Sequence, residues 1–187
     1  MSVPFERPAP PVVTQSSMTC CWAAALESWR RAEEMPGNLS QEDLLRAFRA
    51  VPGALQRNTE RATAEVGASL IANFNWMQAA VFSGARLTAN FWGSRLESGY
   101  IYVWYVRGGF GHCGVIYGVT QSVVKIMDPW KGRGLIEREI NFFNSCQNAL
   151  VGTATLSGHV HNPFIGIFDA PPAPSRSSDS ALPGYNF

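Results

Sequence analysis

The chain has 187 residues, of which 46% are hydrophobic and 16% are charged, and its formal net charge is +1. This length fits one domain that can bury a sizeable core. No lysine-rich or arginine-rich run indicates a surface for nucleic acid or a membrane, and no stretch is long and apolar enough to span a bilayer. We therefore expect neither nucleic acid nor a membrane as a partner.

The two ends of the chain differ in composition from its middle. Residues 1–11 hold several prolines and are expected to form an extended arm. Residues 12–169 are expected to fold as the domain, and residues 170–187, rich in proline and serine, are expected to form a disordered tail. The first residues lack an apolar signal-peptide core, so we expect synthesis in a cytoplasm without a cleaved signal.

A first helix is predicted over about residues 20–34. Its apolar residues Trp22, Ala25, Leu26 and Trp29 recur at the spacing of one helix face. The residues that could cap its N-terminus are Ser16, Ser17 and Thr19. This pattern places two adjacent cysteines at the start of the helix.

The rest of the chain changes from helical to strand-like patterns. A capping box that begins at Ser40 predicts a second helix ending near Val51, and residues 57–82 are predicted to hold one or two more helices. The later predicted elements are strands at 100–106, 112–119, 123–128, 149–156 and 164–168, a loop at 108–111, a turn at 120–122 and a short helix at 139–146. Helices followed by antiparallel strands indicate an α+β fold.

The helix start at Cys21 is a suitable place for a nucleophile. The positive end of the helix favours an anion, which lowers the pKa of a cysteine there and increases its thiolate fraction. Gln15 lies six residues upstream, and its amide could donate a hydrogen bond to an oxyanion beside the sulfur. Cys20 is the competing nucleophile, whereas Cys113 and Cys146 are expected to be packed as small buried residues.

A predicted hairpin supplies the partners that a cysteine nucleophile needs. A turn at residues 120–122 would place His112 and Asp128 opposite each other to within a residue or two. A carboxylate beside an imidazole fixes its tautomer and stabilises the imidazolium. Gly109, Gly111 and Gly114, which flank the histidine, leave room for a substrate backbone.

These motifs resemble those of papain-like cysteine peptidases. Gln15 followed six residues later by Cys21-Trp22-Ala23 resembles the nucleophile signature of that clan. Gly111-His112 leading to Asp128-Pro129-Trp130 resembles the branch that holds the bacterial double-glycine peptidases and related secreted effector proteases. The resemblance implies a helical half with Cys21, a β half with His112 and Asp128, Gln15 in the oxyanion hole, and Trp130 shielding the His–Asp hydrogen bond.

We therefore predict a cysteine endopeptidase that works through a Cys21–His112–Asp128 triad and an acyl-enzyme, without a cofactor. The resemblance favours cleavage after Gly-Gly in an exposed segment of a protein substrate. It also suggests a bacterial toxin or effector, made in the cytoplasm, exported by a specialised secretion system into a target cell, and restrained by an inhibitory or immunity protein.

Three alternatives remain open at this point. The same triad serves a peptidoglycan amidase or an acyl transferase. A non-catalytic papain-like module would bind a peptide without cleaving it. His159 and His161 could begin a metal site, although no third ligand lies at suitable spacing, so no metal is predicted.

Overall fold

The computed structural model describes residues 4–47, 77–82, 87–107, 110–146 and 151–156. The helices are α1 (Cys21–Ala32), α2 (Gln41–Ala47), α5 (Ala89–Ser98) and α6 (Ile140–Asn144). The strands are β1 (Phe5–Glu6), β2 (Met77–Phe82), β3 (Ile101–Arg107), β4 (Phe110–Val119), β5 (Val123–Asp128), β6 (Gly134–Glu139) and β7 (Val151–Leu156). No helix in these ranges is long and apolar enough to cross a membrane.

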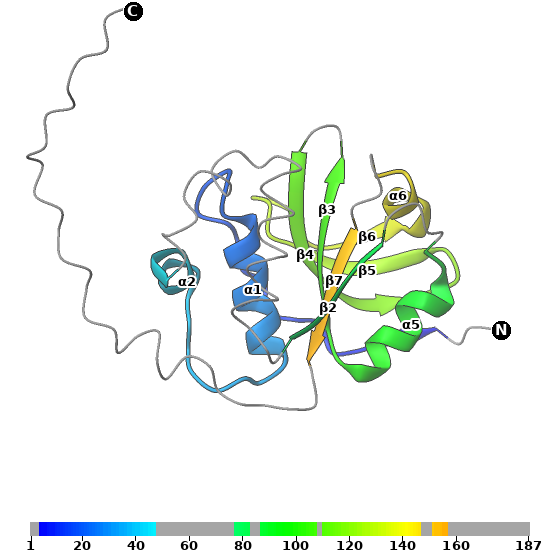
Figure 1. Ribbon diagram of the computed structural model, residues 1–187, viewed down its shortest axis with the longest axis horizontal. Helices are drawn as coiled ribbons and strands as arrows, with labels where there is room; N and C mark the ends of the chain where they lie inside the picture. The colour runs from blue at the N-terminus through cyan, green and yellow to red at the C-terminus, as the bar shows by residue number, and fades with distance from the viewer. Residues whose placement is uncertain (1–3, 48–76, 83–86, 108–109, 147–150, 157–187) are drawn as a thin grey trace, which may run out of the picture.

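The strands form one antiparallel sheet with the order β2-β7-β3-β4-β5-β6, and β1 pairs with the end of β4. Helices α1 and α2 lie on one side of this sheet, and α5 and α6 lie on the other (Figure 1). The combination of helices with an antiparallel sheet confirms the predicted α+β class.

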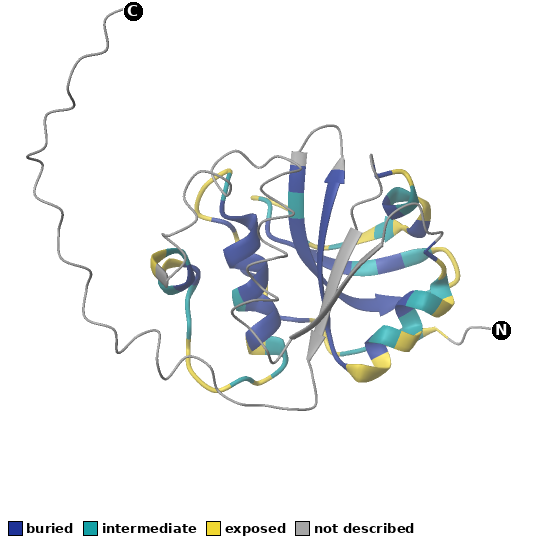
Figure 2. Ribbon diagram, viewed as in Figure 1, coloured by how far each residue is buried: buried dark blue, intermediate teal, exposed yellow. Residues whose placement is uncertain are grey.

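Each face of the sheet has its own hydrophobic cluster, because successive strand residues point to opposite faces. Tyr102 and Trp104 of β3 pack toward α1, whereas Val103 and Tyr105 pack toward α5 and α6. Helix α1 is buried along most of its length (Figure 2), since the sheet covers one side and α2 another. Its run of alanines, Ala23 to Ala25, is completely buried and allows close approach of its neighbours.

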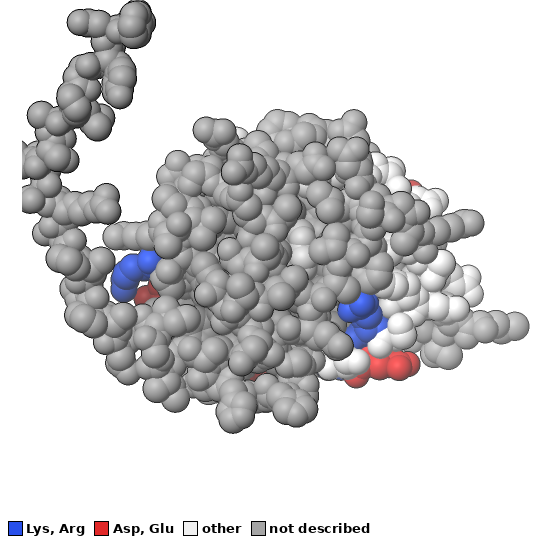
Figure 3. All heavy atoms as spheres, viewed as in Figure 1, with Lys and Arg blue, Asp and Glu red and all other residues white. Residues whose placement is uncertain are grey.

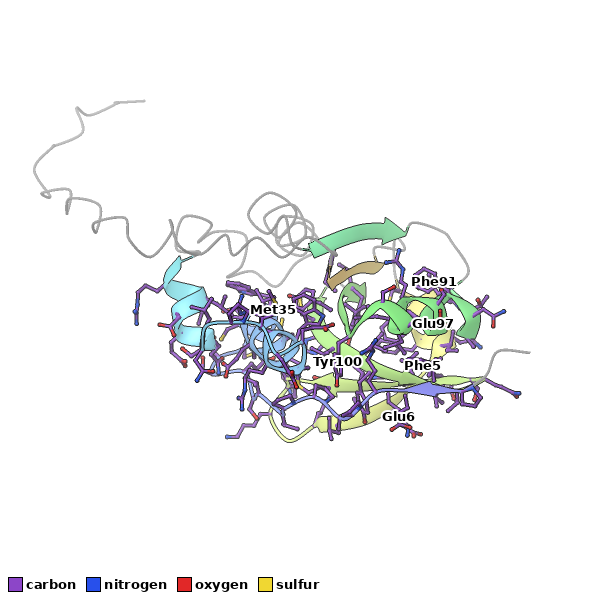
Figure 4. The ribbon with its side chains drawn as sticks, turned by 90° about the horizontal axis from the view of Figure 1, so that it is seen from below. Phe5, Glu6, Met35, Phe91, Glu97 and Tyr100 are labelled. Atoms are coloured by element: carbon purple, nitrogen blue, oxygen red, sulfur yellow. The ribbon has the colours of Figure 1, made fainter. Side chains whose placement is uncertain are left out.

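The N-terminal arm is part of the folded structure. Phe5 and Glu6 pair with the end of β4, and the arm then runs toward α1 (Figure 4). The Arg7 guanidinium donates hydrogen bonds to the carbonyl oxygens of Leu96 (2.6 Å) and Glu97 (3.0 Å), at the C-terminal end of α5. The arm therefore connects β4 with α5.

Several described charged side chains form pairs of opposite sign. Lys125 lies 2.6 Å from Glu6, and Arg31 lies 3.4 Å from Glu27 one helical turn away. The described charges visible in Figure 3 are few and include both signs. Exposed pairs of this kind each contribute only about 0–1 kcal/mol to stability.

Several predicted elements are confirmed. The first helix, the β4–β5 hairpin with its turn, strand β7 and the short helix α6 form where the sequence indicated. At α2, the Ser40 hydroxyl donates to the Asp43 carboxylate (2.8 Å), and the Asp43 N–H donates back to the hydroxyl (3.2 Å), as in a capping box.

Other expectations are wrong. Residues 77–82 form strand β2 rather than a helix, because they pair with β7 along their whole length. Phe110 and Gly111 belong to β4 rather than to a loop. Helix α5 and strand β6 were not predicted. Gly93 lies within the helix, and Gly132 and Gly134 lie just before and at the start of the strand, and glycines usually indicate a break. The predictions for residues 48–51, 57–76, 108–109, 157–169 and 170–187 lie outside the described residues.

Candidate active site

Cys21 is the first residue of α1, so its sulfur lies at the positive end of a helix of 12 residues. The residue that precedes the helix as its N-cap is Cys20, which makes no side-chain capping bond to the helix. The expectation that Ser16, Ser17 or Thr19 caps α1 is therefore wrong. These residues belong instead to the turn that leads into the helix.

The two adjacent cysteines have different surroundings. The Cys20 sulfur accepts hydrogen bonds from the Ser17 N–H (3.0 Å), and it also lies within hydrogen-bonding distance of the Ser17 hydroxyl (2.7 Å). Cys20 is thus held by the turn before the helix. The Cys21 side chain instead reaches strand β4, where it meets His112 and Cys113.

The contacts of Cys21 favour its thiolate. A hydrogen bond from the Cys113 side chain and the hydrogen bond and positive charge of His112 outweigh the effect of burial and lower the pKa of Cys21 to about 5. Burial and the Cys21 contact raise the pKa of Cys113 well above its ordinary value, so Cys113 remains a thiol. Cys113 is buried as predicted, but it also contacts the candidate nucleophile, which the sequence did not indicate.

His112 connects Cys21 with Asp128. Its Nε2 atom lies 2.8 Å from Oδ1 of Asp128, and its ring packs edge-on against Tyr105, its partner across the β3–β4 pair. Burial lowers the pKa of His112, but the hydrogen bonds and charges of Asp128 and Cys21 outweigh it and raise the pKa to about 9. Since Nε2 faces Asp128, Nδ1 is the ring nitrogen left to exchange a proton with the sulfur.

Asp128 is buried and accepts hydrogen bonds on both carboxylate oxygens. Oδ1 accepts from His112 and from the Trp130 backbone N–H (2.9 Å), and Oδ2 accepts from Arg133 (3.1 Å) and Arg138 (3.3 Å). These donors outweigh the desolvation of the carboxyl and hold the pKa of Asp128 well below its usual range. The carboxylate therefore stays charged and fixed in orientation beside the imidazole.

The predicted hairpin geometry differs in one detail. The β4–β5 register shifts between Ile116 and Gly118, and its last aligned pair is Val115 with Met127. His112 and Asp128 therefore meet diagonally near the end of the hairpin rather than directly across it. The sequence prediction allowed for a difference of a residue or two, and the contact itself forms.

Gln15 lies in the loop between the arm and α1, and its side chain is buried. Its backbone N–H donates to the Pro129 carbonyl (2.8 Å), which ties this loop to the segment after Asp128. Its Nε2 atom donates to the Ser17 carbonyl (2.7 Å), while its Oε1 atom is buried without a hydrogen-bond partner among the described residues. The amide thus points into the loop that leads to Cys21.

The other predicted residues have clear positions where the structure describes them. The Trp130 ring centroid lies 6.3 Å from that of His112, on the same segment as the Asp128 contact. Gly111 is a buried residue of β4, and Gly109 lies outside the described residues, as do His159 and His161. No group of three His, Cys, Asp or Glu side chains in the described part of the chain could hold a metal ion.

The sequence reading missed three contributors to this site. Arg133 and Arg138 bind Asp128 from the segment around β6, a strand that was not predicted. Gln41 of α2 binds the backbone on both sides of Gln15. The Gln41 contacts join segments far apart in the chain, so no local pattern predicts them, and the Arg138 contact depends on the pairing of β6 with β5. For Arg133, its short separation from Asp128 along the chain is the only signal in the sequence that could have indicated the contact.

Two solved structures resemble this one at low sequence identity. The peptidase domain of Streptococcus ComA, a bifunctional ABC transporter in a quorum-sensing pathway, matches with TM-score 0.49 and 17% identity, over 78% of this chain and 98% of that chain. A double-glycine-motif protease from an AMS/PCAT transporter, solved with its leader peptide, matches with TM-score 0.45 and 15% identity, over 83% of this chain and 100% of that chain. Similarity at this level carries no argument about substrate. No curated protein matches the chain.

A match to a protein family covers most of the sequence. Residues 5–148 match the family described as papain-like cysteine protease AvrRpt2. This span includes most of the N-terminal arm, α1, the β4–β5 hairpin and β6, and hence all of the described side chains of the candidate site. It confirms the resemblance to papain-like cysteine peptidases that the sequence motifs indicated. The chain belongs to the AvrRpt2 family of papain-like cysteine proteases and is a hydrolase.

Proposed function

We propose that this protease is an endopeptidase in which Cys21 is the nucleophile, His112 the general acid and base, and Asp128 the group that orients the histidine. The single observation that carries the proposal is the placement of the His112 ring between the Asp128 carboxylate and the Cys21 sulfur. With the pKa of Cys21 lowered to about 5 and that of His112 raised to about 9, the pair is a thiolate and an imidazolium at neutral pH.

The reaction follows from these protonation states. The Cys21 thiolate attacks the carbonyl carbon of the scissile peptide, and the electron pair of the C=O bond moves to the oxygen. As the C–N bond breaks, the His112 imidazolium gives its proton to the leaving amine, and a thioester remains on Cys21. His112 then takes a proton from water, the resulting hydroxide attacks the thioester, and the C–S bond breaks to return the thiolate.

The oxyanion of each tetrahedral intermediate needs hydrogen-bond donors. We assign this role to the Gln15 side-chain amide together with the backbone N–H of Cys21 at the start of α1. Support comes from the Gln15 amide being directed into the loop that leads to Cys21, where one of its hydrogens is donated to the Ser17 carbonyl. The amide has a second hydrogen, and that hydrogen is the one proposed to bind the oxyanion.

Variants of the two adjacent cysteines test the assignment directly. Peptidase activity should disappear in Cys21→Ala and fall almost as far in His112→Ala, because members of a triad act as a unit. Cys20→Ala should retain most of the activity, since its sulfur binds the preceding turn instead of the histidine. Hydrolysis of a protein substrate and of bacterial cell walls would be compared in parallel. An inactive Cys20→Ala beside an active Cys21→Ala would reverse the assignment.

For substrate choice we propose cleavage after Gly-Gly in an exposed, flexible segment of a target protein. Support comes from the likeness of Gly111-His112 and Asp128-Pro129-Trp130 to the motifs of double-glycine peptidases. A site too narrow for a side chain excludes larger residues sterically, whereas a missing methylene changes discrimination by only about 1–3 kcal/mol. Profiling with a peptide library should therefore show small residues before the cut. A preference for aromatic or basic residues there would refute the Gly-Gly proposal and leave the triad unaffected.

We also propose that the protein acts as a bacterial toxin or effector, exported into a target cell and restrained at home by an inhibitory or immunity protein. The physical support is that thiolate, imidazolium and carboxylate are already assembled in the unbound chain, so a cell that makes it needs protection. Expression of the wild type should slow growth, whereas Cys21→Ala should not. Mapping of new protein N-termini in the same cells would identify the target, and their absence would refute the proposal.

A further inference from the structure

The Gln41 side chain binds both peptide groups that flank Gln15. Its Oε1 atom accepts from the Ser16 N–H (3.0 Å), and its Nε2 atom donates to the Thr14 carbonyl (3.0 Å). Gln41 is the first residue of α2, and its own N–H donates to the Glu27 carboxylate of α1 (2.7 Å). One buried residue thus joins α2 to the loop that carries the proposed oxyanion donor through its side chain, and joins α2 to α1 through its backbone N–H.

Helix α2 does not need this side chain for its own end. The cap of α2 is formed by Ser40 and Asp43, which bind each other through side chain and backbone. The Gln41 side chain instead bonds to the loop through both its amide oxygen and its NH2 group. Fully satisfied buried hydrogen bonds of this kind rigidify the groups that they join, here the loop backbone on both sides of Gln15.

The Gln15 loop is also held by the segment that follows Asp128. The Gln15 N–H donates to the Pro129 carbonyl, directly after Asp128. Gln41 holds Thr14 and Ser16 toward α2, while Pro129 holds the residue between them toward the histidine–aspartate pair. The backbone of Gln15 is therefore fixed on both sides, and its side chain has little freedom to leave the site.

We propose that Gln41 is a positioning residue that fixes the Gln15 amide for oxyanion binding. This inference rests on the proposed role of Gln15. The Gln41 side chain bonds to the Thr14 and Ser16 backbone, and we propose that it acts through that backbone. Misplacement of a catalytic group by about 1 Å can cost about 100-fold in rate, so loss of this contact should reduce kcat more than it raises KM.

Only an amide satisfies both contacts, because it presents an acceptor and a donor at fixed spacing. Gln41→Met keeps the length of the side chain and removes both hydrogen bonds. Gln41→Glu keeps the acceptor for Ser16 but places a second acceptor against the Thr14 carbonyl and a charge near Glu27. The two variants therefore separate loss of the contact from its replacement by repulsion, and either one can test the proposal if the other folds poorly.

The experiment measures kcat and KM of Gln41→Met, Gln41→Glu, Gln15→Ala and Gln15→Ala/Gln41→Met, together with the Cys21 thiolate titration. Ser40→Ala is the matched control, because it weakens the α2 cap without touching the Gln15 loop. We expect Gln41→Met to lower kcat by about 10-fold or more, out of the roughly 100- to 1,000-fold that an oxyanion donor contributes. The double variant should be no slower than Gln15→Ala, the thiolate titration should be unchanged, and Ser40→Ala should keep its kcat.

The outcomes separate the inference from the function on which it rests. If Gln15→Ala retains full kcat, the proposed oxyanion role of Gln15 is wrong. If Gln15→Ala is slow but both Gln41 variants keep kcat within about twofold, Gln41 does not position Gln15 and the inference fails alone. Multiplying losses in the double variant, or a shifted thiolate titration in Gln41→Met, would show a general structural role and also overturn the inference.

Discussion

Cys21 and His112 depend on each other for their charges. The Cys21 thiolate exists above a pKa of about 5, and the His112 imidazolium exists below a pKa of about 9. As pH falls through the lower value, the sulfur gains a proton and loses its nucleophilicity. As pH rises through the upper value, the leaving amine loses its proton donor. The pair should therefore be active in the window between these values, with a bell-shaped dependence of kcat/KM.

The pattern of donors around Asp128 makes a sharp prediction for Asp128→Asn. An asparagine can direct its oxygen toward His112 or toward Arg133 and Arg138, but not both. The two arginine charges should outweigh the His112 ring and the Trp130 N–H on the other side, which turns the NH2 group toward His112 and forces the wrong tautomer. We expect a loss of kcat of up to about 10⁴-fold, the size seen when a triad carboxylate is replaced in this way.

Removal of Arg133 and Arg138 should then change kcat in opposite directions in the wild type and in Asp128→Asn. Arg133→Met combined with Arg138→Met should lower kcat when Asp128 is present, because the carboxylate loses two donors. The same pair should raise kcat in Asp128→Asn, because the amide oxygen can return to His112. Losses of similar size in both backgrounds, measured at one pH within the active window, would show that the arginines do not orient residue 128.

The hairpin of β4 and β5 is the element that brings the histidine to the aspartate. Gly114 lies between them, and a Cβ atom built there would sit 2.8 Å from Ile126 Cδ1 and 2.9 Å from the Met127 carbonyl oxygen. Backbone cannot move away from such a contact without opening the strand pair. The glycine thus serves the close approach of β5 to β4, rather than leaving room for a substrate.

Gly114→Ala should therefore damage both stability and catalysis. We expect the free energy of unfolding to fall by about 1–3 kcal/mol, as for other overpacked interiors, and kcat to fall because His112 and Asp128 separate. Gly93→Ala in α5 is the matched control, since its Cβ would meet only Val119 at 3.8 Å. That variant should be as stable as the wild type or more stable. Urea unfolding would measure both, and an unchanged midpoint for Gly114→Ala would contradict this packing.

Elements could be predicted from the sequence where their signals are local. The turn at residues 120–122 and the continuous β-branched and aromatic run of β3 gave the central strands, and the helical spacing after Cys21 gave α1. Strand β2 was mistaken for a helix because its pairing with β7 is the information that decides its conformation. The prediction of the α1 N-cap was also wrong, because Ser16 and Ser17 contact the Cys20 sulfur instead of the backbone N–H groups of the helix.

At the scale of the whole molecule, the candidate site is assembled from segments far apart in the sequence. Cys21 comes from α1, His112 and Asp128 from the central hairpin, and Gln15 from the loop after the arm. The residues proposed to perform the chemistry could be found from the sequence because each lies in a short motif. The residues that hold them, Gln41 and Arg138, could not, because their partners are set by how helices and strands pack around the sheet.

The proposed peptidase chemistry depends on a thiolate at Cys21 in the folded protein. Ultraviolet absorbance of the thiolate, titrated with pH as the difference between wild type and Cys21→Ala, measures it without any substrate. We predict a transition with a midpoint at about 5, so that one Cys21-dependent thiolate is present at neutral pH, and His112→Ala should move this midpoint upward. A Cys21-dependent transition only near the ordinary value of 9.0, unchanged in His112→Ala, would contradict the account.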